Sequence, residues 1–154
     1  MKKRLFMLFV PVVVATLVAG CGGGDDPMEP EPPAVEPPPN LTGSYALVSL
    51  SSVLSGGLTL TPPLVSGTFS LTQTSVSGDE ATGNLSLTLM YPDGAGGTST
   101  IMDEGTFVIR TDGSWEQTGN LQQGRGTYSL AGNVLTVMVT EPPAAVSTTV
   151  WQRQ

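Results

Sequence analysis

The sequence has no histidine and only one cysteine, Cys21. Without histidine the chain lacks the commonest general base and the commonest metal ligand of proteins, so histidine-based hydrolases and zinc sites are excluded. A single cysteine excludes an intramolecular disulfide. The chain also has no Walker loop and no nucleophile elbow. We therefore expect a protein that is not an enzyme and that uses no metal or other cofactor.

Basic residues are scarce as well, and half of the six stand at the very start, as Lys2, Lys3 and Arg4. After these, three arginines stand against thirteen acidic residues, which gives that part of the chain a net charge of −10. Such a surface repels phosphate backbones, so we expect no binding to nucleic acid. It also repels anionic lipid, so attachment to a membrane requires a covalent lipid.

Long hydrophobic runs are missing except at residues 5–18, which follow the cationic start and contain Pro11. This run is too short to cross a bilayer of roughly 30 Å as a helix, and its length is typical of an export signal. Small residues, Ala19 and Gly20, then stand directly before Cys21, where they fit the narrow approach of a signal peptidase. An ordinary secretory signal followed by an incidental cysteine is the alternative.

The segment Val18-Ala19-Gly20-Cys21 resembles the lipobox of bacterial lipoproteins. The resemblance implies that residues 1–20 are a signal peptide, that the Cys21 thiol carries a diacylglycerol and that cleavage occurs just before it. Several acyl chains hold a protein stably on a membrane, whereas one chain binds marginally. Gly22 stands where an aspartate would resemble an inner-membrane retention signal. We therefore expect a lipid-anchored protein of the bacterial cell envelope, at the outer membrane, facing either the periplasm or the cell surface.

Residues 21–40 are poor in large apolar side chains. Three glycines follow Cys21, and residues 25–40 contain seven prolines and five acidic residues. Proline removes backbone donors and favours polyproline II, and a segment of this composition cannot bury a core. We expect a disordered or semi-rigid tether between the lipid and a folded domain, with a Pro-rich recognition motif as the alternative.

From Leu41 onward, apolar and polar residues alternate with period two, as in residues 85–91. Turn sequences such as Asp112-Gly113 separate neighbouring segments by very few residues, which favours antiparallel hairpins. We expect eight strands, at residues 43–53, 65–74, 81–91, 98–111, 114–119, 124–131, 133–140 and 147–153. The pattern predicts one small all-β domain at 41–154, an up-and-down antiparallel β-barrel, with a two-sheet β-sandwich as the alternative.

The two ends of this domain carry a family resemblance. Gly43-Ser44-Tyr45 opens the first expected strand, and Trp151-Gln152-Arg153 closes the last. This layout is similar to that of lipocalin-like barrels, in which a Gly-x-aromatic segment packs at the closed base and an arginine from the end lies across the ring. The resemblance implies that Gly43, Tyr45, Trp151 and Arg153 close the barrel. Residues 126–137 also look like the late hairpin of small bacterial lipocalin-like domains.

Two further features have alternative interpretations. Trp115 follows a turn, and it either closes one mouth of the barrel or offers a stacking platform for a ligand. The acidic pairs Asp79-Glu80 and Asp103-Glu104 could bind Ca²⁺ or perform glycosidase chemistry if they converged. Adjacent residues of a strand point to opposite faces, so we interpret these pairs as solvated charge and expect no metal site.

Two functional hypotheses follow from this organisation. The first is a non-enzymatic binding module, in which the barrel holds a small apolar ligand or grips a protein partner of the envelope. The alternative is a structural or interaction protein whose barrel is fully packed and holds no ligand. Eight-stranded barrels of both kinds are possible, so the free volume inside the barrel decides between them. We expect the protein to be a monomer.

Overall fold

The computed structural model describes residues 36–154, which belong to one compact unit. The expected signal peptide at 1–20, the lipid site at Cys21 and residues 22–35 of the expected tether lie outside the described residues. All the buried hydrophobic core residues fall between Leu41 and Trp151. The folded domain therefore supplies its own core.

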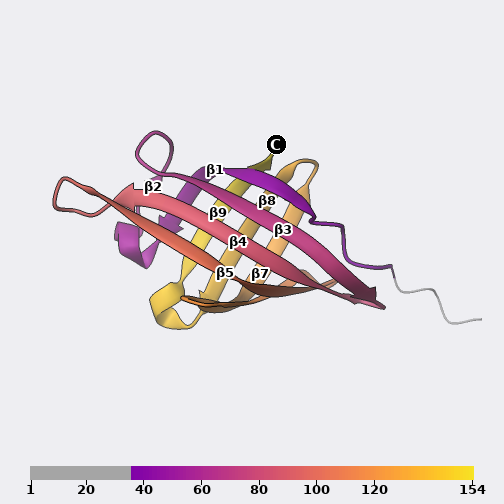
Figure 1. Cartoon of the computed structure of the whole chain (residues 1–154). Helices are drawn as coiled ribbons and strands as arrows, with labels where there is room; N and C mark the ends of the chain where they lie inside the picture. The colour runs from indigo at the N-terminus through magenta and orange to yellow at the C-terminus, as the bar shows by residue number, and fades with distance from the viewer. Residues whose placement is uncertain (1–35) are drawn as a thin grey trace, which may run out of the picture. The chain divides into compact units, whose positions relative to one another are not determined.

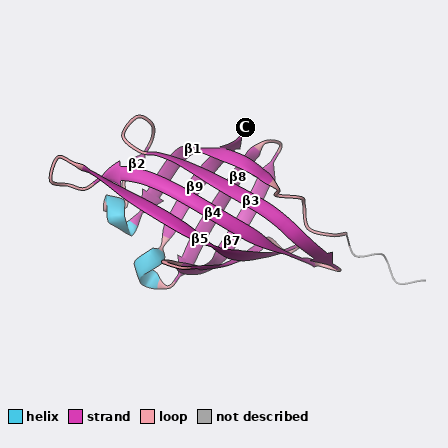
Figure 2. Ribbon diagram, viewed as in Figure 1, coloured by secondary structure: helices cyan, strands magenta, loops and turns pink. Residues whose placement is uncertain are grey.

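Antiparallel strands make up almost the whole domain (Figure 1). The strands are β1 Gly43–Ser52, β2 Thr59–Leu60, β3 Ser66–Ser77, β4 Glu80–Pro92, β5 Thr98–Arg110, β6 Ser114–Gly119, β7 Gln123–Ala131, β8 Val134–Glu141 and β9 Ser147–Arg153. Two short 3₁₀ helices, η1 Val53–Ser55 and η2 Pro143–Ala145, lie at one end of the barrel, the end that also carries the β4–β5 hairpin loop (Figure 2). The expected strands agree with the observed ones to within a few residues, and β2 was not expected.

Pairing between the first and last strands closes the sheet into a barrel. Residues of β1 pair along one edge with β9, from Tyr45 opposite Arg153 to Ser52 opposite Ser147. Along its other edge the first half of β1 pairs with β3, and its second half pairs with the short β2. Eight strands form the ring and β2 lies outside it. The predicted all-β antiparallel barrel is confirmed, and the sandwich alternative is wrong.

Tight turns with left-handed glycines join the strands at one end of the barrel. Gly113 has φ 86° between β5 and β6, and Gly132 has φ 59° between β7 and β8. Residues with a Cβ rarely adopt these angles, so the Asp-Gly and Gly-Asn sequences fix hairpins at these positions. This end, with the β3–β4 turn, is called the closed end below, and the end with η1 and η2 is called the open end.

Aromatic side chains fill the closed half of the barrel. The rings of Phe107 and Trp115 stack in parallel, with centroids 5.5 Å apart. Phe107 is paired across the strands with Gly83, and a Cβ on Gly83 would come within 2.7 Å of the Phe107 ring. Tyr128 is buried in the same half, and its hydroxyl donates to the Arg110 carbonyl at 3.0 Å. Glycine at position 83 therefore leaves room for the Phe107 ring, which stacks on Trp115.

Candidate functional site: an internal cavity at the open end

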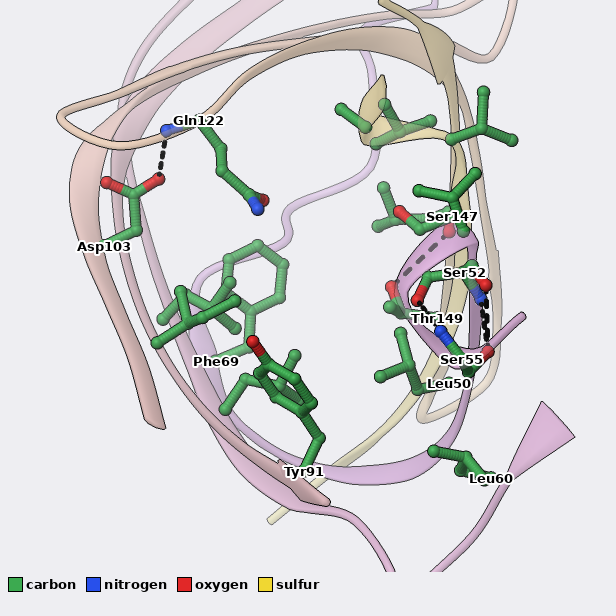
Figure 3. Close-up of a pocket in the computed structure, with 18 of the residues that line it drawn as sticks. Leu50, Ser52, Ser55, Leu60, Phe69, Tyr91, Asp103, Gln122, Ser147 and Thr149 are labelled. Carbon is green, nitrogen blue, oxygen red and sulfur yellow. Dashed lines mark hydrogen bonds between the residues drawn. The ribbon is translucent and has the colours of Figure 1, made fainter. Parts of the chain in front are cut away.

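A cavity of about 530 Å³ occupies the open half of the barrel (Figure 3). Pockets that hold small ligands typically measure about 300–1,000 Å³, so this volume is sufficient for one. Apolar side chains from strands all around the ring face it, among them Leu50, Leu87, Leu89, Ile101 and Val139. The hypothesis of a fully packed barrel is therefore wrong for the open half of the molecule.

Leu87 shows how the cavity changes the exposure of inward-facing residues. It is the cross-strand partner of Phe69, which is buried, and it points to the same inner face. Leu87 itself is only partly buried, as are Tyr91 and Ile101, which also line the cavity. These side chains face inward and still keep accessible surface, because the space in front of them is empty of protein.

The floor of the cavity consists of two aromatic rings. Phe69 and Trp151 both line it, and their ring centroids lie 5.2 Å apart. The indole N–H of Trp151 donates to the Thr149 hydroxyl at 2.7 Å, which satisfies the only polar atom of this side chain. A ligand that entered the cavity would rest on Phe69 and Trp151.

Trp115 lies behind this floor and has no exposed surface. Its ring centroid is 6.1 Å from that of Phe69, one face stacks on Phe107, and its indole N–H donates to Gln117 at 3.0 Å. It is not among the residues that line the cavity. The structure therefore places Trp115 in the packed core, where its ring faces are in contact with protein, and assigns the contact with the cavity to Trp151.

The Tyr45–Arg153 contact that the lipocalin-like layout implies is present at the closed end. The guanidinium carbon of Arg153 lies 5.2 Å from the Tyr45 ring centroid, and its N–H groups donate to the Tyr45 hydroxyl at 3.1 and 2.6 Å. The hydroxyl in turn donates to the Leu41 carbonyl at 2.8 Å. A Cβ on Gly43 would lie 3.2 Å from Arg153 Nε, so glycine leaves room for the guanidinium.

The closed end also includes residues just before the expected domain boundary. Pro38 is buried, and the Asn40 carbonyl accepts a hydrogen bond of 2.9 Å from Arg153. The packed structure thus begins before Leu41, because the last residues of the expected tether lie against the barrel base. Proline can do this without leaving a buried N–H group unpaired.

Asp103 is a site residue that the sequence analysis missed. It was interpreted as solvated charge, but it is only 2% exposed and lines the cavity. Its two oxygens accept hydrogen bonds from the backbone N–H groups of Leu121 and Gln122, at 2.9 and 3.1 Å. Figure 3 shows the bond from Gln122. These donors are free to bind a side chain because β6 has already ended at Gly119. Glu104, the next residue, is exposed, so the two carboxylates do point to opposite faces.

Glu80 keeps solvent contact on the outer surface, as expected, with its side chain 41% exposed, and it also forms an ion pair. Its carboxylate lies 2.9 Å from the guanidinium of Arg110, which also contacts Glu116 at 3.0 Å. Hydrogen bonding to Glu116 is the main cause that raises the pKa of Arg110, and Glu80 adds to it. Arg125 lies 3.7 Å from Glu116 on the same surface. This outer cluster uses two of the three arginines of the described chain and keeps them away from the cavity.

Within residues 36–154, no group of three or more histidine, cysteine, aspartate or glutamate side chains is placed to hold a metal ion. The same part of the chain has no helix that is long and apolar enough to cross a membrane. No family model matches the chain, and neither a curated protein nor a solved structure matches it.

Proposed function

We propose that this protein is a lipid-anchored lipoprotein of the bacterial cell envelope whose barrel is a non-enzymatic binding module for a small apolar ligand. The lipid on Cys21 attaches the chain to the outer membrane, and the Pro-rich tether holds the barrel away from the lipid surface. The barrel takes up the ligand through its open end. The observation that carries this proposal is the cavity of about 530 Å³ with its aliphatic walls and its floor of Phe69 and Trp151.

The rim of the open end supports the same function. Leu58 and Leu64 in the loop between β1 and β3, and Leu121 in the β6–β7 loop, are each more than 60% exposed. Val53 of η1 and Val146 after η2 are also exposed at this end, where the Val53 N–H donates to the Val146 carbonyl at 3.2 Å. An apolar entrance lowers the cost of moving an apolar ligand from a membrane or carrier into the cavity, because the ligand keeps apolar contacts on the way.

Binding of a neutral fluorescent probe tests the cavity. The chain from residue 22 onward, which contains every described core residue, is titrated with phenylnaphthylamine, whose emission rises in apolar surroundings. We expect saturable binding that weakens at least roughly tenfold in Leu87→Trp, because the larger ring fills the cavity. Met102→Trp is the matched control, since Met102 is exposed on the neighbouring strand. Absence of saturable binding, or equal binding by both variants, would contradict the proposal.

Partition of the exported full chain tests the anchor. The wild type should enter the detergent phase and yield a processed form, while Cys21→Ser should accumulate as an unprocessed or a soluble form. Ser51→Ala, which keeps the whole N-terminal segment, should behave as the wild type. If Cys21→Ser is processed and partitions as the wild type does, the lipid is not on Cys21.

A further inference from the structure

Charge is unevenly distributed among the residues that line the cavity. Among the described residues that line it are two carboxylates, Asp93 and Asp103, and no arginine or lysine. Asp93 is exposed in the β4–β5 loop, where its carboxylate accepts from the backbone N–H groups of Ala95 and Gly97, each at 2.8 Å. Asp103 is buried in the wall. A ligand inside the cavity therefore meets negative charge and no positive charge from the lining side chains.

Within residues 36–154, no arginine forms an ion pair with the buried Asp103. Among the described residues, Arg110 and Arg125 contact the outer acidic cluster and Arg153 contacts Tyr45. Buried carboxylates are rarely left without a positive partner, because removal from water disfavours the charge. The carboxylate can accept about four hydrogen bonds, and two backbone N–H groups use part of this capacity. Asp103 lines the cavity with very little exposed surface, so only a donor packed closely against it can use the remaining capacity.

The strand geometry holds Asp103 in this position. It is the cross-strand partner of Leu87, so the carboxylate and the aliphatic wall share the inner face of the barrel. A Cβ on Gly119 would collide with the Asp103 carboxylate, and glycine at this position makes the room for it. Gln117 and the side chain of Gln122, which extends into the interior in Figure 3, add amide groups on the same side. The cavity thus has one anionic side with amide groups, and the rest of its lining is mainly aliphatic and aromatic with a few hydroxyl groups, among them Ser147 and Thr149.

We propose that the ligand is an apolar molecule with an amine head group, and that the cavity discriminates against fatty acids and other apolar carboxylates. This inference rests on the proposed binding function and names the chemical class of its ligand. The amine donates to Asp103, the amides of Gln117 and Gln122 complete its surroundings, and the hydrocarbon lies against Leu87 and the aromatic floor. A carboxylate head would face Asp103 with no cation to offset the repulsion.

Competition between three ligands with the same hydrocarbon chain tests this preference. Decylamine, decanol and decanoate displace phenylnaphthylamine from the chain starting at residue 22, at neutral pH and about 0.15 M salt, where the Debye length is about 8 Å and long-range attraction to the acidic surface is screened. We expect decylamine to bind roughly tenfold more tightly than decanol, as a charge-assisted hydrogen bond suggests, and decanoate to bind most weakly. Decanoate binding as well as or better than decanol overturns the inference but leaves the cavity function intact. If the probe and all three ligands fail to bind, the proposed function itself is wrong.

The variant Asp103→Asn tests whether Asp103 causes the preference for an amine head group, and Glu104→Gln is its matched control. Both variants remove one carboxylate from β5, but only Asp103 lines the cavity. Asp103→Asn should lose the roughly tenfold preference for decylamine over decanol and should still bind the neutral probe. Glu104→Gln should keep the wild-type order of affinities for the three ligands. An unchanged order in Asp103→Asn, or the same loss in both variants, would overturn the assignment to Asp103. The wild-type ligand series decides the ligand class even if Asp103→Asn does not fold.

Discussion

The two ends of this barrel follow the same alternating pattern, yet one is solid and the other is hollow. The closed half holds Trp115, Phe107 and Tyr128, whose rings fill the space inside the ring of strands. The open half presents Leu, Ile, Val and small hydroxyl residues at the equivalent inward positions and leaves about 530 Å³ free. Alternation decides which residues face inward, whereas the volume of those residues decides whether a cavity remains.

The largest difference between the halves is expected in stability. Trp115→Ala should lower the free energy of unfolding by about 3–5 kcal/mol, because it removes a fully buried ring from a packed core. Leu87→Ala should cost only about 1 kcal/mol, because Leu87 already faces empty space and loses fewer contacts. Urea denaturation of both variants measures these values. Equal losses would mean that the closed and open halves are packed alike.

A smaller effect is expected at the closed end, where Arg153 ties β9 to β1. Arg153→Ala should lower the free energy of unfolding by about 1.5–3 kcal/mol, because it removes charge-assisted hydrogen bonds to Tyr45 and to the Asn40 carbonyl. Arg125→Ala provides the comparison, since that guanidinium is 71% exposed and its ion pair is long. The free energy of unfolding of Arg125→Ala should stay within about 0.5 kcal/mol of the wild-type value. A similar change in both variants would show that Arg153 contributes no more than a surface charge.

Much of the fold could be predicted from these residues. Period-two alternation and Asp-Gly or Gly-Asn turns have local causes, so the strands and hairpins are readable from the sequence. The pairing of Tyr45 with Arg153 was also predicted, because an up-and-down barrel must bring its first and last strands together. Only β2 was missed, since a strand of two residues has no period to detect.

The cavity could not be predicted in the same way. Whether inward-facing residues meet across the barrel depends on the diameter and stagger of the closed sheet, which no local pattern reports. Asp103 was misassigned because its burial depends on where β6 ends and on the space beside Gly119. The sequence did contain a signal for its burial. Asp103 lies an even number of positions from Ile101 and Ile109 along β5, so it shares their inward-facing side of the strand.

The loop that Asp103 holds should be the next most sensitive feature of the open half. Gly119→Ala should displace the Asp103 carboxylate and weaken its hydrogen bonds to Leu121 and Gln122, at a cost of about 1 kcal/mol. Amide hydrogen exchange at Leu121 and Gln122 should accelerate, while exchange in β8 should not change. Thr118→Ala, one residue earlier, is the control and should leave amide exchange unchanged both in the loop and in β8. If exchange in the loop does not respond to Gly119→Ala, the carboxylate does not hold it.

The smallest effect is expected on the pH dependence of stability, through Tyr128 at the closed end. Burial, with a smaller contribution from Asp112, raises the pKa of Tyr128 above its ordinary value of about 10. The native state then keeps the Tyr128 proton up to a higher pH than the unfolded state does. The contribution of Tyr128 to the free energy of unfolding is therefore complete below about pH 10 and is lost as the pH rises through the native pKa. Tyr128→Phe should therefore show a shallower loss of unfolding free energy above about pH 10 than the wild type. Identical pH slopes would show that Tyr128 titrates as an exposed tyrosine.

Contact quenching of the two tryptophans tests the hollow and solid halves most directly. In Trp115→Phe only Trp151 at the cavity floor emits, and in Trp151→Phe only the buried Trp115 emits. A bromine-labelled decanol, which quenches a ring only on contact, should quench Trp151 saturably and should leave Trp115 nearly unaffected. Equal quenching of the two rings, or no saturable quenching of Trp151, would contradict a barrel that is packed at one end and open to a ligand at the other.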